Sequence, residues 1–343
     1  MTSYMASMDA LFPLCQRSLS RRAMRGMKGS MLRLALSRLV SAVPTLLAVV
    51  LFSFILMRYA PGSPFDGERA LDPQLRAALE AKYGLDDPLP VQVFRYVGGL
   101  LRGDFGPSIV YPDFTVNQLI AQGLPVSLRL GALALMAALV GGILIGVWAA
   151  VRAGGWLDRL LMIKATLLTA IPTFVTGPVL VLLFGLTLGW LPLSGLGAED
   201  AGWGTRAAHL LLPVIALALP FIGAIAKLTR AGLAAQLDSD YVRAARGRGL
   251  SPFRVLTRHA LRPALVPVAS YLGPAAAGLL TGAVVIETVF ALPGLGRYFV
   301  QGALNRDYPL VLGVVTLYAA LIILFNLVAD LLYGWLDPRM RER

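Results

Sequence analysis

Residues 240–267 read DYVRAARGRGLSPFRVLTRHALRPALVP, a strongly basic segment between two long apolar stretches. The segment holds six arginines against a single acid, Asp240. Alanines that favour helix precede Gly249, a residue type that commonly ends helices, and Ser251-Pro252 has the cap and first residue of a new helix. The pattern predicts two short helices joined by a turn, a hairpin suited to docking on another protein.

The composition is that of a membrane protein. Hydrophobic residues make up 57% of the 343-residue chain, charged residues only 15%, and the mean hydropathy is +0.70. These values exclude a soluble domain of that length. The net charge of +12 lies in short basic blocks between apolar runs, which is typical of topology signals rather than of a basic groove. No nucleic-acid partner is therefore expected.

Residues with catalytic or metal-binding chemistry are scarce. Cys15 is the only cysteine, so no internal disulfide is possible. His209 and His259 have no Cys, His or acidic neighbours at ligand spacing, which predicts no metal site. A Gly-x-x-x-x-Gly-Lys-Ser/Thr phosphate loop is missing, so the sequence is not that of an ATPase. We expect no metal, no cofactor and no catalytic residue.

Charge-free runs of 19 to 34 residues locate the membrane spans. A hydrocarbon core of roughly 30 Å needs about 20 helical residues, so the runs predict an all-α polytopic membrane protein with six transmembrane helices. The third run is longer than one span needs, and we place its helix at about 165–188, with residues 189–202 as a Gly-rich external loop. The runs are Leu39–Met57, Leu130–Val151, Ala165–Ala198, Ala207–Ala226, Pro263–Ile286 and Tyr308–Ala329.

The positions of Lys and Arg predict the orientation. With the N-terminus inside, the internal segments hold 21 of the 31 basic residues. The positive-inside rule then puts both termini and the 227–262 loop in the cytoplasm. The expected divisions are residues 1–30 as a cytoplasmic tail or a misassigned upstream start, 31–57 as the first transmembrane helix, 58–126 as an extracytoplasmic segment, 127–335 as the transmembrane core and 336–343 as a cytoplasmic C-terminus.

The extracytoplasmic segment is predicted to contain two short helices. Asp72-Pro73 has cap and first-residue chemistry, and Gly84 is expected to end that helix. A second helix, about 90–102, places apolar residues on one face. That face suits either the membrane surface or a partner, and packing against the protein's own bundle is an equal alternative.

The spans are rich in proline and small residues but nearly free of charge. Proline kinks a lipid-embedded helix and frees a backbone carbonyl. Such a residue is tolerated where neighbouring helices or a water-lined path satisfy that carbonyl, so the pattern favours a moving, pathway-forming bundle. An ion-coupled carrier usually needs intramembrane acids or bases, and Glu287, at the end of the fifth span, is the nearest case. We therefore expect the energy for any transport to enter from another subunit.

An ordered set of motifs along residues 31–340 resembles the permease subunits of peptide and nickel ABC importers, and among them the B-type permeases of oligopeptide importers. The hairpin resembles the Glu-Ala-Ala…Gly coupling loop of that family, with Arg243 in place of the glutamate. The other matching segments are APGSPF at 60–65, GDFGPS at 103–108, LPVS at 124–127, ETVF at 287–290, LPGLG at 292–296, GALNRDY at 302–308 and LDPR at 336–339.

The resemblance implies a type I ABC-importer permease fold in a bacterial cytoplasmic (inner) membrane. It implies a second homologous permease, two cytoplasmic ABC ATPases, an extracytoplasmic peptide-binding protein and contact with membrane lipid as partners. The loop 238–262 would couple the ATPases to the bundle through Arg243, Ala244, Ala245, Gly249, Leu250, His259 and Leu261. An external gate or a contact for the binding protein is expected at Glu287, Pro293, Gly294 and Gly296, with a simple structural turn as an equal alternative.

Three other functions remain as alternatives. A dipeptide, glutathione or nickel permease differs from this interpretation only in substrate. A secondary carrier or channel would not need the basic hairpin, and a carrier would be expected to show inverted repeats. An intramembrane enzyme would need a nucleophile and base, or paired acids, at membrane depth, and the spans supply neither.

Overall fold

The computed structural model describes residues 36–59, 74, 84, 86–198 and 202–336, without side-chain detail for 332–336. Within these ranges the chain is helical, and its only β-type pairing is an isolated bridge between Pro107 and Thr115. Five helices are long and apolar enough to cross a membrane. They are Leu36–Tyr59, α4 (Val116–Val151), α7 (Trp203–Leu237), α11 (Val266–Val289) and α13 (Tyr308–Leu336).

A bent pair of helical segments gives a sixth crossing when its two parts are counted as one span. Helix α5 (Trp156–Ala170) is followed at 102° by α6 (Thr173–Leu180), which continues as the π-helix η1 (Val181–Thr187). The break falls at Ile171, which is extended (φ −82°, ψ 122°) because the following proline disfavours helix at that position. Counting the pair as one span confirms the six predicted crossings, although the expected range of about 165–188 lies across the bend.

Helices α4 and α7 form the centre of the bundle. At 1.5 Å per residue their 36 and 35 residues extend over about 50 Å, more than the roughly 30 Å hydrocarbon core. Glycines bring them together, since a Cβ at Gly142 would lie 2.7 Å from the Cβ of Ile225, and one at Gly146 would lie 2.6 Å from the carbonyl oxygen of Ala226. Small residues permit such close approach between membrane helices.

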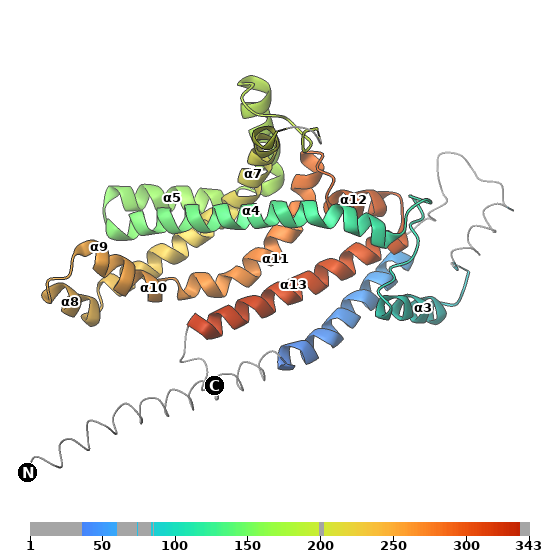
Figure 1. Ribbon diagram of the computed structural model, residues 1–343, viewed down its shortest axis with the longest axis horizontal. Coiled ribbons are helices and arrows are strands. Elements are labelled where there is room, and N and C mark those ends of the chain that lie inside the picture. The colour runs from blue at the N-terminus through green and yellow to red at the C-terminus, as the bar shows by residue number, and fades with distance from the viewer. Residues whose placement is uncertain (1–35, 60–73, 75–83, 85, 199–201, 337–343) are drawn as a thin grey trace, which may run out of the picture.

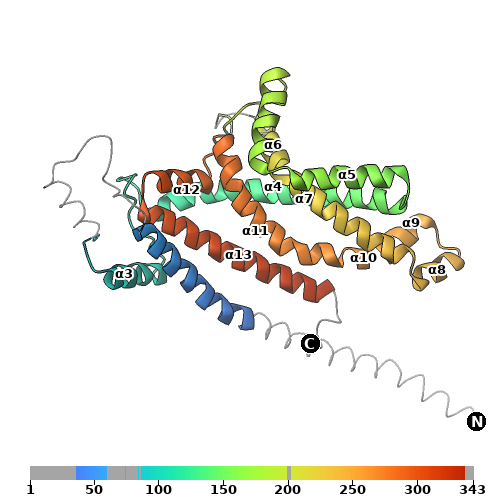
Figure 2. The same ribbon diagram turned by 180° about the vertical axis from the view of Figure 1, so that it is seen from behind.

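The short helices gather at the two ends of the bundle. Figures 1 and 2 show α8, α9 and α10 at one end, and α3 and α12 at the opposite end. The first helix begins, and α13 ends, on the α8 side, where Arg38 Nε lies 3.0 Å from Asp330 Oδ2. The bounds of the short helices are α3 Leu89–Leu101, α8 Asp240–Gly247, α9 Pro252–Arg254, α10 Leu261–Ala264 and α12 Leu295–Leu304.

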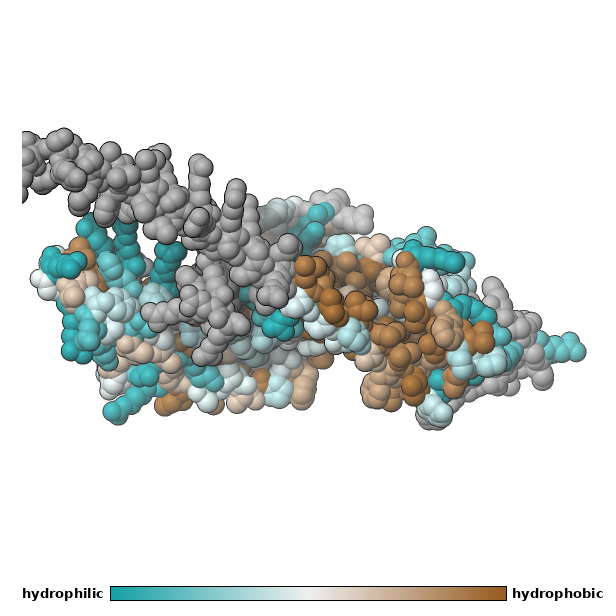
Figure 3. Space-filling view, turned by 90° about the horizontal axis from the view of Figure 1, so that it is seen from below, coloured by the Kyte–Doolittle hydropathy of each residue, from teal (hydrophilic) through white to brown (hydrophobic). Residues whose placement is uncertain are grey.

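The extracytoplasmic helix predicted at about 90–102 is α3. Its apolar residues do not all face the bundle, because Phe94 is 78% exposed and Leu101 is 86% exposed. Most of the helix predicted from Asp72 lies outside the described residues, but Gly84 has the left-handed φ of +64° expected where a helix ends. In Figure 3 hydrophobic residues form a patch between the middle of the molecule and the end opposite α8, and hydrophilic residues gather toward α8 and again at the opposite tip.

Candidate functional site

The basic segment folds as the predicted helix, turn and helix. Helix α8 ends at Gly247, and α9 continues without a gap through the π-helix η2 (Val255–Ala260) into α10. Between them Gly249 adopts φ +76°, and its backbone N–H donates to the carbonyl of Arg246 at 3.0 Å. That conformation is strained for residues with a side chain, which explains glycine at the turn.

The inner side of this hairpin is a small hydrophobic core shared with the long helices. Val242 and Ala245 of α8 pack against Val255 and Ala260 of η2, together with Leu233 of α7. Ala150, at the end of α4, belongs to the same cluster. The hairpin is therefore packed on α7 and α4 rather than suspended from them.

The two alanines of the coupling motif have different roles in this packing. Ala245 is buried, whereas Ala244 is exposed on the outer face beside Arg243. Arg243 donates from Nη2 to the carbonyl of Asp238 at 3.0 Å, which holds its side chain along the start of α8. Phe253, an aromatic residue on the second arm that belongs to none of the predicted sites, is 76% exposed.

The remaining four predicted coupling residues differ in their exposure to solvent. Gly249 is exposed, whereas Leu250, His259 and Leu261 are partly buried. The carbonyl of His259 lies 3.4 Å from the hydroxyl of Tyr241, which bridges the two arms. The structure thus brings the seven residues together in one hairpin, with Ala244, Arg243 and Gly249 open to contact.

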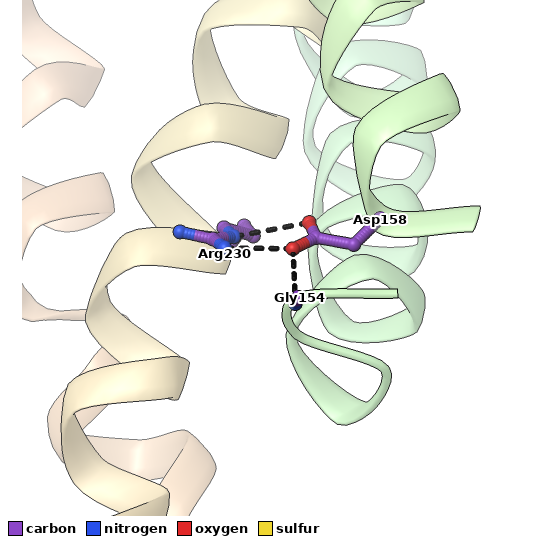
Figure 4. A network of polar contacts seen from close by, with 3 residues as sticks. All are labelled: Gly154, Asp158 and Arg230. Atoms are coloured by element: carbon purple, nitrogen blue, oxygen red, sulfur yellow. Dashed lines mark hydrogen bonds and ion pairs between the residues drawn. The ribbon is translucent and has the colours of Figure 1, made fainter. Parts of the chain in front are cut away.

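An ion pair next to the hairpin was not predicted. Asp158, buried at the start of α5, accepts from Arg230 of α7, at 3.1 Å from Nε and 2.7 Å from Nη2 (Figure 4). The backbone N–H of Gly154 donates to the same carboxylate at 2.9 Å. The pair therefore fixes the α4–α5 turn to α7, one helical turn before Leu233 enters the hairpin core.

The segment expected to act as an external gate is held in place by buried polar side chains. Glu287 is fully buried, and its Oε2 accepts from the backbone N–H of Gly296 at 2.7 Å. The hydroxyl of Ser127 on α4 accepts from the N–H of Leu295 at 2.9 Å. The carboxylate lies so close to Gly294 that a Cβ there would have no room. These contacts hold the start of α12 against α11 and α4.

Only part of that predicted site is accessible. Glu287, Gly294 and Gly296 are buried, whereas Pro293 is exposed at the tip of the turn. Ala291 precedes it with a left-handed φ of +51°, a conformation that is uncommon for residues other than glycine. Pro293 is thus the member of the set that can meet a partner directly, and the other three position it.

Two of the motifs that carry the family resemblance meet at the same end of the bundle. Asp307, buried at the start of α13, accepts from the hydroxyl of Ser108 and from the backbone N–H groups of Ile109 and Val110 at 3.0 and 2.9 Å. Asp104 shapes the same loop by accepting from the N–H of Gly106 at 2.9 Å. Among the described residues, no group of three His, Cys, Asp or Glu side chains is placed to hold a metal ion.

Residues 142–342 match the family described as "Binding-protein-dependent transport system inner membrane component". The chain belongs to this family. It is 47% identical over 312 residues to the oligopeptide transport system permease protein OppB of Haemophilus influenzae, and 48% identical to that of Salmonella typhimurium, in each case over 91% of this chain and the whole of the relative. Identity to the dipeptide permease DppB of Bacillus subtilis is 40% over 91% of this chain and 98% of that protein.

The fold is also that of solved ABC importers. An inward-facing structure of the MetNI methionine ABC transporter aligns with a TM-score of 0.52 at 18% identity, over 64% of this chain and 97% of that chain. A second crystal form gives a TM-score of 0.51. The chain is thus a multi-pass permease subunit with the type I ABC-importer fold.

Proposed function

We propose that this permease forms half of the transmembrane path of an ATP-driven oligopeptide importer. The observation that supports the substrate class is the identity of 47–48% to proteins named as oligopeptide permeases along their whole length. The dipeptide permease matches over a similar length at 40%. A dipeptide, glutathione or nickel substrate is the alternative within the family.

The proposed partners are those that the family resemblance implies, and the sequence agrees with this division of labour. Its sequence contains no phosphate-binding loop for ATP, so two separate cytoplasmic ATPases would supply the energy. A second, homologous permease would complete the path, and an extracytoplasmic binding protein would deliver the peptide. The hairpin end would face the cytoplasm, in agreement with the clustering of arginines there and the positive-inside rule.

The hairpin would transmit the motion of the ATPases. Ala244, Arg243 and Gly249 are its exposed members, and the small side chain of Ala244 permits close docking of a partner surface. Since Ala245 and Val242 pack with Leu233 of α7, a displaced hairpin would move α7 and, through Arg230 and Asp158, the turn before α5. Such rigid coupling suits alternating access, in which the bundle opens outward with ATP bound and resets after hydrolysis.

The turn at Pro293 would contact the binding protein or the gate on the other side. Its exposure, and the buried anchors Glu287, Gly294 and Gly296, support a rigid loop that presents one residue outward. A secondary carrier or channel is the alternative from another class of transport protein. Such a protein works without an ATPase, so the exposed face of the hairpin would have no partner.

Purification from native membranes tests the assembly. Mass spectrometry of the bound proteins should recover a second six-span permease and cytoplasmic ATPase subunits. A chain that purifies alone, under conditions in which a known ABC importer stays intact, would support the carrier or channel instead. Uptake of labelled peptides of two to six residues, glutathione and Ni²⁺ into proteoliposomes of the recovered complex then separates the substrates.

A further inference from the structure

A basic side chain, Lys227, lies within the helical bundle rather than at its end. The apolar run that predicted the fourth span ends at Ala226, but helix α7 continues for ten residues beyond Lys227, to Leu237. Ionisable side chains inside membrane spans are costly, and they indicate a functional site by default. The surroundings of Lys227 therefore indicate which ligand it binds.

The neighbouring helix α4 gives the depth of Lys227. Helices α4 and α7 run in the same direction, and Gly142 of α4 packs against Ile225, two residues before Lys227. Gly142 is ten residues before Arg152, the first charged residue after the apolar run of α4. At 1.5 Å per residue, the α-carbon of Lys227 is therefore about 12 Å inside that charged end. An ammonium group at this depth needs a charged partner or water.

The ammonium group of Lys227 has a single hydrogen-bond acceptor among the residues that the structure describes. Its Nζ donates to Oγ1 of Thr169 on α5 at 3.1 Å. No described acid forms an ion pair with it, whereas Arg230, about one turn further along α7, is paired with Asp158 (Figure 4). An ammonium has three N–H donors, so two of them, together with the positive charge, remain for another partner.

Lys227 lies on the side of α7 that the other described helices leave open. Helix α4 packs on Ile225, α5 packs on Gly223, and α11 packs on Phe221. With 3.6 residues per turn, these contacts occupy three sides of α7. The remaining side carries Pro220, Ala224, Lys227 and Ala231, none of which is buried.

Polar side chains continue this open surface onto the two flanking helices. Thr166 of α5, and Ser270 and Thr281 of α11, are exposed. By the same helical geometry they border the open side of α7. The outer side of α5 differs, because its exposed residues there include the apolar Ile163 and Leu167. Hydroxyl groups and small side chains around a cation are suited to water and a polar solute rather than to acyl chains.

We propose that Lys227 faces the translocation path and binds the C-terminal carboxylate of the transported peptide. The inference rests on the proposed function as an oligopeptide importer. Every unmodified linear peptide has this carboxylate whatever its side chains, so one cation serves substrates of varied sequence. The hydrogen bond to Thr169 orients the ammonium group. A lysine acts as a point charge without the two-bonded geometry of arginine, so the peptide is held loosely enough to leave.

Uptake of one peptide in two forms tests the proposal. A hexapeptide with uncharged side chains is supplied as the free acid and as the C-terminal amide to proteoliposomes that contain the complete importer and its binding protein. The ratio of acid to amide uptake is compared between parent and variant, which cancels any preference of the binding protein. Lys227→Gln should lower this ratio about tenfold, because a charge-assisted hydrogen bond is lost. Lys227→Arg keeps the charge and should retain most of the ratio.

The matched control is a second lysine of the bundle. Lys164 of α5 is exposed, but it lines an apolar cavity of about 290 Å³ on the side of α5 and α7 that faces α4. Lys164→Gln should leave the ratio unchanged. An unchanged ratio in Lys227→Gln, an equal loss of acid and amide, or an equal effect of Lys164→Gln would each overturn the proposal. A parent complex that imports neither form contradicts the proposed function instead.

Thiol labelling tests the position of Lys227 without any substrate. Lys227→Cys is made in a Cys15→Ser background and treated with a membrane-impermeant methanethiosulfonate reagent, with and without ATP. Mass spectrometry of this chain should show labelling in at least one of the two states. A cysteine that stays unlabelled in both would mean that the second permease covers this side of α7 and supplies the partner of Lys227, which would overturn the proposal. Size-exclusion profiles that match the parent complex establish that the variants are folded.

Discussion

Arg230 of α7 donates two hydrogen bonds to Asp158 of α5, which lies 72 residues earlier in the chain. The acid is buried and the side chain of the arginine is 34% exposed, so the pair is partly shielded from water. Helix α7 leads directly into the hairpin that we propose as the coupling element. The pair therefore ties the α4–α5 turn to the helix that carries this hairpin.

Replacing Asp158 with asparagine should weaken the contact between the start of α5 and α7. Arg230 would lose its charged acceptor while remaining partly buried, which costs about 1–3 kcal/mol. We expect a lower unfolding temperature of the purified complex and weaker coupling between ATP hydrolysis and uptake. Arg230→Lys keeps the charge but not the two-bonded geometry and should have a smaller effect. If Asp158→Asn and Arg230→Gln together destabilise by the sum of the single changes, the two residues do not act as a pair.

A second prediction concerns the loop that Asp307 holds. Asp307→Ala should free residues 108–110, because Oδ2 of the carboxylate accepts from the Ser108 hydroxyl and from the N–H groups of Ile109 and Val110. Alanine leaves these buried donors without their acceptor, at a cost of about 1–3 kcal/mol. Hydrogen–deuterium exchange should rise in residues 104–111. Ser108→Ala removes one of these bonds and should raise it less, and equal exchange in both variants would argue against this role.

Local patterns in the sequence were enough to predict the spans and the hairpin. Long apolar runs predict helices, and Gly249 between two helix-favouring segments predicts a turn, because these are features of neighbouring residues. The break at Ile171 also has a local cause, Pro172, although proline alone does not distinguish a kink from a 102° bend.

The polar contacts could not be predicted in the same way. Asp158 and Arg230 are separated by 72 residues and Ser108 and Asp307 by 199, and no local pattern links either pair. Glu287 illustrates the ambiguity at a single site. A glutamate at the end of an apolar run is compatible with an exposed contact or a buried anchor, and only the packing of α12 distinguishes them.

The turn of the hairpin gives a third prediction. A Cβ at Gly249 would meet no atom within 4 Å, so space does not limit the residue there, but φ +76° does. Gly249→Val should strain the turn by about 1–2 kcal/mol and separate ATP hydrolysis from peptide uptake, while membrane insertion stays normal. Gly249→Asn is the matched control, because asparagine tolerates the left-handed region, and it should retain most of the uptake. Unchanged peptide uptake in Gly249→Val would refute the assignment of this turn as a hinge.

The last prediction tests whether Glu287 anchors α12 through its hydrogen-bond acceptor or through its negative charge. Glu287→Gln keeps an oxygen that can accept from the N–H of Gly296, whereas Glu287→Ala removes the acceptor and leaves space beside Gly294. An unpaired buried amide costs about 1–3 kcal/mol, so the alanine variant should detach the start of α12. Hydrogen exchange at residues 294–298 measures this detachment directly, and uptake should fall if the Pro293 turn must be held rigid. If exchange rises above that of the parent by the same amount in Glu287→Gln and Glu287→Ala, the negative charge, rather than the hydrogen-bond acceptor, anchors the helix.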